Sequence, residues 1–363
     1  MKTKILHVQL TKNFGGIESL LTNVYANIDR TKYQFDFIAT AKEPYQEKLK
    51  RLGGRIYLAP SIKHLVPYVK FFNHILDNNY DVVHFHKNSA ANVIPILLTK
   101  YHPSHPKIIV HSHNTSPSVN NVGLMFLHKL NRSILIKIAD KEVACANVAA
   151  KWMFGTSKDV QIINNGIDID KFTFSSAARE SIRRKLNIPF NDLVLGNVGR
   201  FSEQKNQSFL IDIFKEVEKE NPNSRLILVG DGHLLKNIKE KVNSLGLGSK
   251  VIFTGKEKNI PDYLSAMDIF VMPSLYEGLP ISAVEAQAEG LGVYLSDAIS
   301  KEVVLTNNTK MFSLNDEPNV IARQLLNYIK SNNREDGAKT VKEYYSLEKT
   351  VKDFTNLYQG ILQ

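Results

Sequence analysis

Cysteine is almost missing from this sequence. The 363 residues include one cysteine, Cys145. A single cysteine cannot form a disulfide within the chain, so a disulfide-stabilised fold is excluded and a reducing compartment is favoured. We therefore expect a cytoplasmic protein.

Long apolar runs are missing as well. No stretch is long enough to span a bilayer. The first ten residues, MKTKILHVQL, are too short and too polar for a signal peptide, and no small-residue cleavage site follows them. We expect them to form the first strand of a sheet. The length and the ordinary composition favour two soluble domains.

Acidic residues are scarce in the first half of the chain. The net charge is +10, and residues 1–170 hold 21 lysines and arginines against 12 aspartates and glutamates. A basic half beside a nearly neutral half indicates that one domain faces something anionic. No nucleic-acid-binding module is recognisable, so we expect no nucleic-acid partner and favour an anionic membrane surface. Charge that serves solubility alone is the alternative.

Short runs rich in Ile, Val and Phe alternate with longer amphipathic segments. Such alternation predicts βα units and parallel sheets covered by helices on both faces. The first set of expected strands covers residues 4–9, 34–39, 55–59, 81–86, 107–113, 142–146 and 160–163. The pattern then restarts with residues 192–199, 225–230, 250–255, 268–273 and 292–296. The sequence thus predicts an α/β protein with two consecutive Rossmann-like, doubly wound domains.

The domain boundary is expected where periodicity weakens. Residues 165–190 lack a strong apolar period and carry turn residues, which is typical of a linker. We expect an N-terminal domain at 1–170 and a C-terminal domain at 171–345. Residues 346–363 have apolar side chains at helical spacing and should form a closing amphipathic helix.

The stretch SLYEGLPISAVEAQAEG, residues 274–290, connects an expected strand to an expected helix. The first N–H groups of a helix have no internal partner and, with the helix dipole, form an anion site that suits phosphate. Gly278 lets a ligand come close to the backbone, and Pro280 presets the turn.

Two glutamates flank this helix start. Glu285 lies where a carboxylate can accept bonds from both ribose hydroxyls, and Glu277 lies near whatever is attached beyond the phosphates. The spacing suits a sugar nucleotide. Two exposed, unrelated glutamates would have the same spacing.

Two further stretches could contribute to the same phosphate site. GRFSEQKN, residues 199–206, places Arg200 and Lys205 after a strand, where two cations can hold a diphosphate and neutralise its charge as it leaves. FGGIES, residues 14–19, forms a glycine turn with Gly15 and Gly16. It is not G-x-G-x-x-G, and no acidic residue follows the second strand as a dinucleotide site requires.

Together these stretches resemble a known family. EGLPISAVE resembles the E-x7-E motif of retaining glycosyltransferases of family 4, and GRFSEQKN resembles that family's Gly-Arg…Gln-Lys loop. FGGIE resembles its amino-terminal glycine turn, and IINNGIDIDKF, residues 162–172, its interdomain segment. Asn164 and Gly292 stand where the family often has proline, so the loops there should differ in shape.

The resemblance implies the GT-B fold, with two Rossmann-like domains and an interdomain cleft. The N-terminal domain would take the acceptor, the C-terminal domain would bind the nucleotide sugar, and the last helix would return to the N-terminal domain. Catalytic roles would fall to His113, Arg200, Lys205 and Glu277, with Arg200 and Lys205 on the diphosphate. The donor would further contact Gly15, Gly16, Gly278, Leu279, Pro280, Ile281 and Glu285.

Two short patterns in the sequence are typical of metal sites. Asp168 and Asp170 match the Asp-x-Asp pattern of metal-dependent glycosyltransferases, but they lie in the expected linker. Arg200 and Lys205 would already neutralise the diphosphate. We therefore expect no metal and no cofactor beyond the substrate. The pairs His84/His86 and His111/His113 raise a rival, a zinc metallohydrolase, although no carboxylate accompanies them. Histidines that line a cleft or cap strand ends are the alternative.

We thus expect a retaining, metal-independent hexosyl- or N-acetylhexosaminyltransferase that moves a sugar from a nucleotide diphosphate, with UDP favoured on family grounds. The acceptor would be a lipid-linked saccharide or polysaccharide in capsule or exopolysaccharide biosynthesis. The basic segments 48–55 and 123–141 would contact the inner face of the cell membrane. A non-catalytic relative is disfavoured because Lys205 and Glu277 are present.

Overall fold

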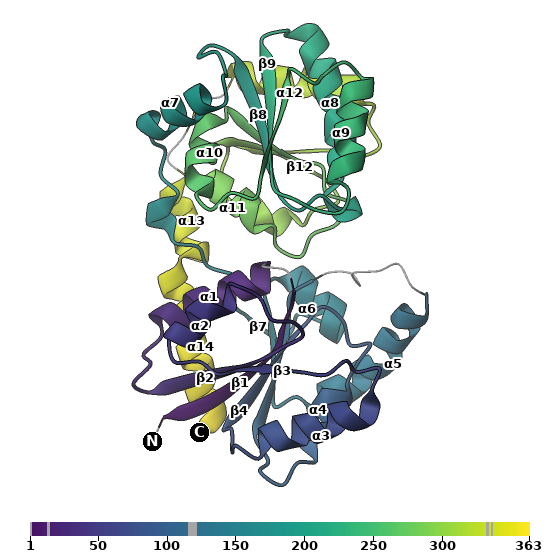
Figure 1. Ribbon diagram of the computed structural model, residues 1–363, viewed down its shortest axis with the longest axis vertical. Helices are drawn as coiled ribbons and strands as arrows, with labels where there is room; N and C mark the ends of the chain where they lie inside the picture. Colours follow the sequence, from purple (N-terminus) through teal and green to yellow (C-terminus); the bar gives the residue numbers. More distant parts are fainter. Residues whose placement is uncertain (1, 13–14, 115–121, 332–333, 335–336) are drawn as a thin grey trace. The chain divides into compact units, whose positions relative to one another are not determined.

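The computed structural model describes residues 2–12, 15–114, 122–331, 334 and 337–363. The chain forms two compact units. Unit 1 comprises Met1–Gly166 and Leu347–Gln363, and unit 2 comprises Ile167–Ser346. Each unit is built on one parallel β-sheet with helices packed on it (Figure 1). The prediction of two doubly wound α/β domains is confirmed.

Unit 1 contains a seven-stranded sheet in the order β3-β2-β1-β4-β5-β6-β7. Its strands are β1 Thr3–Leu10, β2 Tyr33–Ala39, β3 Ile56–Leu58, β4 Val82–Lys87, β5 Lys107–Ser112, β6 Lys141–Ala144 and β7 Gln161–Ile162. Its helices are α1 Gly16–Asn27, α2 Gln46–Arg51, α3 Leu65–Leu76, α4 Ile94–Lys100, α5 Val122–Ile138, α6 Asn147–Phe154 and α14 Leu347–Leu362. Each expected strand of the first set is present, because short β-branched runs bounded by turns form buried parallel strands.

The strand order changes direction between β1 and β4. Strand β1 pairs with β2 on one side and with β4 on the other, and His7 lies opposite His84 in the β1–β4 register. The loops that follow these two strands therefore diverge at the carboxyl edge of the sheet, which is where open α/β sheets bind ligands.

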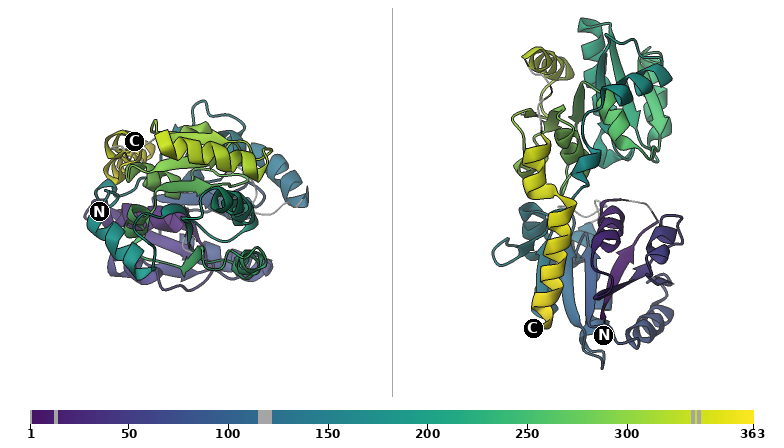
Figure 2. Two further views of the ribbon diagram at one scale, coloured as in Figure 1. Left: turned by 90° about the horizontal axis from the view of Figure 1, so that it is seen from above. Right: turned by 90° about the vertical axis from the view of Figure 1, so that its left-hand side faces the viewer.

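The last helix of the chain, α14, belongs to unit 1. Phe354, Leu357 and Tyr358 of α14 are buried in one core cluster with Ile5 of β1 and Phe35 of β2. Figure 2 shows this helix running along the sheet of unit 1. Its apolar spacing gives it a continuous buried face, and that face holds the chain end on the sheet.

Unit 2 contains a six-stranded sheet in the order β10-β9-β8-β11-β12-β13. Its strands are β8 Leu193–Val198, β9 Ser224–Val229, β10 Val251–Gly255, β11 Ile269–Met272, β12 Gly292–Ser296 and β13 Thr309–Phe312. Its α-helices are α7 Ser176–Lys185, α8 Gln207–Glu220, α9 Leu235–Ser244, α10 Ile260–Ala266, α11 Ile281–Ala288, α12 Pro318–Ser331 and α13 Ala338–Tyr345. Three short 3-10 helices complete the described elements: η1 Ile169–Lys171, η2 Glu203–Lys205 and η3 Lys301–Val303.

Strand β13 was not expected from the sequence. It has four residues, TKMF, and it forms the edge of the sheet beside β12. An edge strand buries fewer of its side chains, so Lys310 is exposed and the apolar run is too short to stand out.

The prediction that residues 165–190 form a linker needs correction, because this stretch contains helix α7. Ser175 caps the helix by accepting the N–H of Ala178 at 3.2 Å. Arg183 is 2% exposed and donates to Asp268 at 2.8 Å and to the Ala266 carbonyl at 3.0 Å. Buried arginine bonds, rather than an apolar stripe, anchor α7, so an apolar period could not reveal it.

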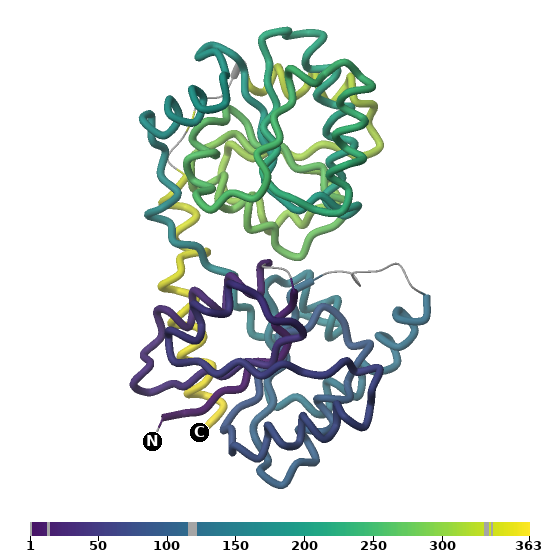
Figure 3. Tube along the Cα trace, in the orientation of Figure 1, coloured from purple at the N-terminus to yellow at the C-terminus, as the bar shows by residue number. Residues whose placement is uncertain are grey.

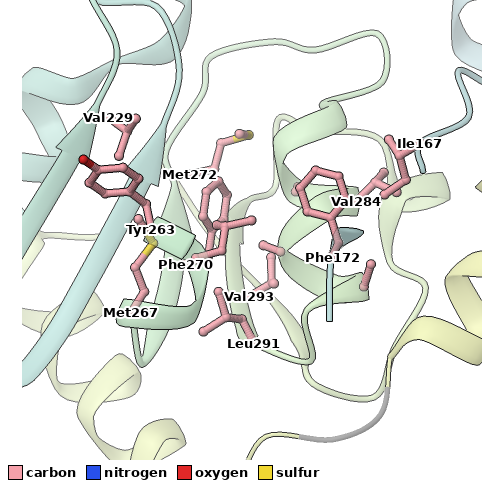
Figure 4. Close-up of a cluster of buried hydrophobic side chains, with 14 of the residues drawn as sticks. Ile167, Phe172, Val229, Tyr263, Met267, Phe270, Met272, Val284, Leu291 and Val293 are labelled. Atoms are coloured by element: carbon pink, nitrogen blue, oxygen red, sulfur yellow. The ribbon is translucent and has the colours of Figure 1, made fainter. Parts of the chain in front are cut away.

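The core of unit 2 fills both faces of its sheet. Figure 4 shows one cluster, in which Phe270 and Met272 of β11 and Val293 of β12 pack against Val284 of α11. The colours of the Cα trace in Figure 3 let the reader follow the two chain segments that enter and leave this unit, at Ile167 and Ser346. The Ile167 N–H donates to the Tyr345 carbonyl at 2.8 Å. The packing of Val284 against β11 and β12 fixes α11 on the sheet and thereby sets where the first turn of α11 lies.

Candidate functional site

Two loops of unit 2 meet at a second change of strand direction. Strand β8 pairs with β9 on one side and with β11 on the other. Residues 199–206 follow β8, and residues 273–280 follow β11. The loops therefore leave neighbouring strands at the same edge of the sheet, the position expected for a ligand.

An ion pair joins these loops. Lys205 Nζ lies 2.7 Å from Glu277 Oε1, and the two side chains are 17% and 7% exposed. Gln204 reinforces the junction, since its Nε2 donates to the Tyr276 carbonyl at 3.0 Å and to Glu277 Oε2 at 3.2 Å. The sequence assigned both charged residues to one site, and the structure brings them together.

Helix α11 begins directly after the second loop. Pro280 is its N-cap, and the Pro280 carbonyl accepts the N–H groups of Ala283 at 2.9 Å and Val284 at 3.3 Å. Ile281 is therefore the first helical residue, and Pro280 precedes the helix instead of occupying its first position. The N–H groups of such a first turn are the ones that a helix does not pair internally, so they can bind an anion.

Glu285 lies one turn into α11 and is half-buried. Burial raises the pKa of its carboxyl group to about 8. At neutral pH, without a ligand, this group is therefore mostly protonated. A ligand that donates hydrogen bonds to the carboxylate would remove that proton.

Arg200 and Lys205 lie in the same loop but differ in surroundings. Arg200 is exposed, and its carbonyl accepts Gln207 Nε2 at 3.0 Å. Lys205 is half-buried, and its stem lies over Gly199, where an added Cβ would stand 3.5 Å from the lysine side chain. Arg200 is thus free to turn toward a ligand, whereas Lys205 is held in place.

Two glycines that the sequence reading missed shape this loop. A Cβ on Gly230 would overlap the carbonyl oxygen of Gly199, and one on Gly232 would overlap that of Phe201. Gly230 also has φ +142°, a conformation that favours glycine. The signal was the G-D-G directly after β9, since glycines after a strand mark a close backbone approach.

The glycine turn of unit 1 opens helix α1. Gly15 is the N-cap, and its N–H donates to Oε2 of Glu18 at 3.0 Å. Glu18 is buried, and its Oε1 also accepts the Thr11 N–H at 2.9 Å. The glutamate of this motif therefore holds the turn, a role the sequence did not suggest. Phe14 lies outside the described residues.

Gly16 needs no unusual backbone angle. Among the residues that the structure describes, a Cβ at Gly16 would meet only Asn165 Nδ2, at 3.9 Å. The described surroundings of Gly16 would therefore accept a small side chain. A glycine that neither φ nor packing requires is compatible with a ligand that approaches the start of α1.

His113 lies at the end of β5 in a cluster of five histidines from three adjacent strands. The other members are His7 of β1, His84 and His86 of β4, and His111 of β5. His113 Nε2 lies 2.9 Å from His86 Nδ1. His113 belongs to the stretch HSHNTS, residues 111–116, of which Thr115 and Ser116 lie outside the described residues.

Burial keeps these histidines uncharged. It lowers the pKa of His7 and of His113 to about 3. It also lowers the pKa values of His84, His86 and His111 well below their usual range, and neighbouring imidazoles add to the effect. Neutral imidazole is both a hydrogen-bonding group and a metal ligand.

The two suspected metal motifs differ in geometry. Asp168 of the Asp-x-Asp pairs with Lys171 at 2.6 Å on the surface of unit 2. Ring nitrogens of His7, His84 and His86, and of His86, His111 and His113, come within 4.8 Å of one another. Among the described residues no carboxylate joins these groups. The histidines thus satisfy the proximity that a metal requires, without an acidic partner.

Among the described residues, no helix combines the length and the hydropathy needed to cross a membrane.

Comparison with known sequences gives matches along nearly the whole chain. The family described as Glycosyltransferase Family 4 matches residues 14–171, and the family described as Glycosyl transferases group 1 matches residues 178–345. EpsF of Bacillus subtilis (strain 168), which is named as a glycosyltransferase, is 34% identical over 83% of this chain and 80% of its own length. An Escherichia coli UDP-Gal:alpha-D-GlcNAc-diphosphoundecaprenol alpha-1,3-galactosyltransferase is 24% identical over 87% of this chain and 85% of its own length.

Solved structures show the same fold. Anabaena Alr3699/HepE in complex with UDP-glucose superposes with a TM-score of 0.83 at 19% identity, over 98% of this chain and 99% of that one. WaaG, a glycosyltransferase involved in lipopolysaccharide biosynthesis, superposes with a TM-score of 0.73 at 15% identity, over 98% of this chain and 100% of WaaG. From these matches, the chain belongs to the group 1 and family 4 glycosyltransferases and has their GT-B fold.

Proposed function

We propose that this glycosyltransferase transfers a sugar from a UDP-sugar to a hydroxyl group with retention of anomeric configuration. The Lys205–Glu277 ion pair beside the start of α11 is the observation that carries the proposal. It combines a cation for a diphosphate, a carboxylate for sugar hydroxyls and a helix N-terminus at one sheet edge.

The donor diphosphate would replace Glu277 as the partner of Lys205. Its oxygens would take Lys205, Arg200 and the first N–H groups of α11, near Gly278, Leu279 and Ile281. Glu277 would then accept hydrogen bonds from the sugar, and Glu285 from the ribose. The cations and the helix start would stabilise the diphosphate as it leaves, which lowers the barrier where negative charge develops.

The remaining donor contacts would come from unit 1. The start of α1 at Gly15 and Gly16 would approach the phosphates, and His113 would face the transferred sugar. Because fixed positive groups already neutralise the diphosphate, the transfer would need no divalent metal. No carboxylate is assigned as a nucleophile, so the acceptor would attack from the face that the diphosphate leaves.

The relatives favour uridine and a hexosyl or N-acetylhexosaminyl donor. HepE was solved in complex with UDP-glucose, and the Escherichia coli relative is named for UDP-Gal. That relative is also named for a diphosphoundecaprenol-linked acceptor, and another relative is the capsular polysaccharide biosynthesis protein CapH of Staphylococcus aureus. A lipid-linked saccharide in cell-surface polysaccharide assembly is therefore the acceptor we propose.

Helix α5 supports a membrane-bound acceptor. Of its 17 residues only His128 and Leu135 are buried, so most of its apolar side chains do not serve the core. Its exposed apolar residues are Val122, Leu124, Phe126, Leu127, Leu130, Ile134 and Ile136. Lys129, Arg132 and Lys137 add positive charge, and the helix contains no acidic residue. Such a helix suits the interface of an anionic bilayer, on the inner face of the cell membrane.

Calorimetry with UDP and a set of UDP-hexoses tests the donor. We expect UDP to bind the wild-type protein and the Lys241→Ala variant alike, since Lys241 pairs with Asp212 of α8 at 2.6 Å and not with a residue of the two loops. Retention is tested by the anomeric configuration of the product, determined by NMR. An inverted product, or a glycosyl-enzyme adduct trapped on a carboxylate, would contradict same-face attack.

A further inference from the structure

Three histidines of unit 1 form a continuous line of hydrogen bonds across β1, β4 and β5. His7 Nδ1 lies 3.0 Å from His86 Nε2, and His86 Nδ1 lies 2.9 Å from His113 Nε2. The central ring therefore uses both of its nitrogens. His84 stacks on His86, and the His111 ring lies tilted against His113, but both stand outside the line. His84 Nδ1 lies 2.9 Å from the Tyr358 hydroxyl, and neither nitrogen of His111 has a hydrogen-bond partner among the described residues.

The rings of the line meet end to end. The ring centres of His7 and His86 are 5.3 Å apart, and those of His86 and His113 are 5.1 Å apart. If two rings meet in a straight line, the distance between their centres equals the nitrogen–nitrogen distance plus the centre-to-nitrogen radius of each ring. Both observed separations are close to that sum. The bonded nitrogens thus point at each other, which suits a shared proton. To bind a metal ion, the two nitrogens would instead have to direct their lone pairs at a common point beside the line that joins them.

Neutral rings in such a line cannot choose their tautomers independently. Each neutral imidazole has one N–H and one lone pair. Each of the two bonds needs one proton, so all three rings must carry it on Nε2 or all three on Nδ1. Any mixed arrangement places two protons or two lone pairs against each other.

We propose that His7, His86 and His113 all carry their proton on Nε2, so that His113 presents a bare Nδ1 as a hydrogen-bond acceptor. The Nε2–H form is the intrinsically favoured tautomer of a histidine side chain, and this arrangement gives it to every ring. If the proposed function holds, the Nδ1 of His113 accepts a hydroxyl of the donor sugar. His86 and His7 are then positioning residues for His113.

Both ends of the line are buried, and neither Nε2 of His7 nor Nδ1 of His113 has a hydrogen-bond partner among the described residues. In either arrangement one end is an unpaired N–H group and the other an unpaired lone pair, so the two ends do not distinguish the arrangements. The direction of the line therefore rests on the intrinsic preference of each ring for the Nε2–H form.

Nitrogen NMR of the wild-type protein, labelled with ¹⁵N-histidine, tests the tautomers directly. We expect a pyrrole-like Nε2 and a pyridine-like Nδ1 for His113, and a through-bond nitrogen–nitrogen coupling between His86 and His113. The reverse pattern, or a missing coupling, would overturn the proposal. A stoichiometric transition metal in untagged protein, bound through His7, His84 and His86, would also overturn it.

Matched variants separate the line from its surroundings. His86→Phe keeps an aromatic ring but removes both bonds, so the His113 signals should move toward the average of two tautomers. His84→Phe is equally buried and outside the line, and it should leave them unchanged. A shift in His84→Phe as large as that in His86→Phe would mean that packing alone sets the His113 tautomer.

Binding connects the line to the donor. His113→Phe should keep UDP affinity and lower UDP-hexose affinity about tenfold, the value of one lost hydrogen bond. His86→Phe should lower UDP-hexose affinity only about twofold, because about half of the His113 rings then carry the proton on Nδ1. If UDP-hexose affinity is unchanged while the NMR pattern holds, the tautomer line stands and the sugar contact of His113 is refuted. If no UDP-sugar binds to the wild-type protein, the proposed function fails and the NMR result is unaffected.

Discussion

Lys205 and Glu277 form a 2.7 Å ion pair that closes two loops of unit 2 onto each other. The pair is largely buried, so each charge depends on the other for compensation. A diphosphate that binds Lys205 must therefore replace Glu277 as its partner and leave that carboxylate for another ligand group. This exchange links diphosphate binding to the availability of Glu277.

Substitution of either partner should separate these two roles. Lys205→Ala should weaken UDP binding by about 10- to 100-fold and leave Glu277 buried without its cation. Glu277→Gln should keep or strengthen UDP binding, because Lys205 no longer has a competing anion, while transfer falls at least 100-fold. Calorimetry and initial rates measure the two effects. Equal loss of UDP affinity in both variants would contradict the exchange.

The raised pKa of Glu285 makes nucleotide binding depend on pH. With a pKa of about 8, the free site is mostly protonated at pH 7, while ribose hydroxyls bind the deprotonated carboxylate best. UDP affinity should rise as the pH increases toward 8 and level off above it. Calorimetry at pH 7 in buffers with different ionisation enthalpies should show proton release on UDP binding, and Glu285→Gln should abolish that release.

The histidine cluster should make unit 1 sensitive to acid. The pKa of His7 falls from its usual 6.5 to about 3 on folding, so the unfolded chain binds more protons between these values. The contribution of His7 to stability is complete above pH 6.5 and is lost as the pH falls through this window, by about 1.4 kcal/mol per pH unit. Urea unfolding from pH 7 to 4.5 measures it, and His7→Phe should flatten the curve.

The glycines after β9 should be intolerant of side chains. Gly232→Ala would push the loop of Arg200 and Lys205 away from β9, and should lower both stability and UDP affinity. Gly360→Ala in α14 is the control, since a Cβ there meets no atom of the described part of the chain within 4 Å. That variant should gain about 1 kcal/mol of helix stability and bind UDP normally. Thermal melts with and without UDP distinguish the two.

Helix α5 should determine binding to anionic lipid. The double variant Phe126→Glu/Leu130→Glu should lose most of its sedimentation with phosphatidylglycerol vesicles at low salt. The two glutamates are repelled by the anionic lipid, and the variant lacks the apolar side chains that would insert into the bilayer. Phe190 of unit 2 is 64% exposed, close to the 65% of Phe126, so Phe190→Glu is the matched control. If wild-type protein fails to bind such vesicles, the membrane proposal is wrong.

Local patterns predicted most of the elements. Each strand expected from an apolar run exists, because a buried parallel strand must be apolar on both faces. Strand β13 and helix α7 were missed for the converse reason. Lys310 and Thr309 interrupt the apolar run of the short edge strand, and Arg183 holds α7 through hydrogen bonds. Neither element therefore shows a periodic apolar pattern in the sequence.

The sequence by itself determined the order of βα units and the loops that carry Arg200, Lys205 and Glu277, because those properties depend on neighbours along the chain. Only the tertiary structure decided that Lys205 meets Glu277, that Glu18 closes the glycine turn and that His7 joins His86 and His113. Strand order sets which distant residues share a sheet edge, and burial sets their charge. Neither quantity can be read from residues adjacent in sequence.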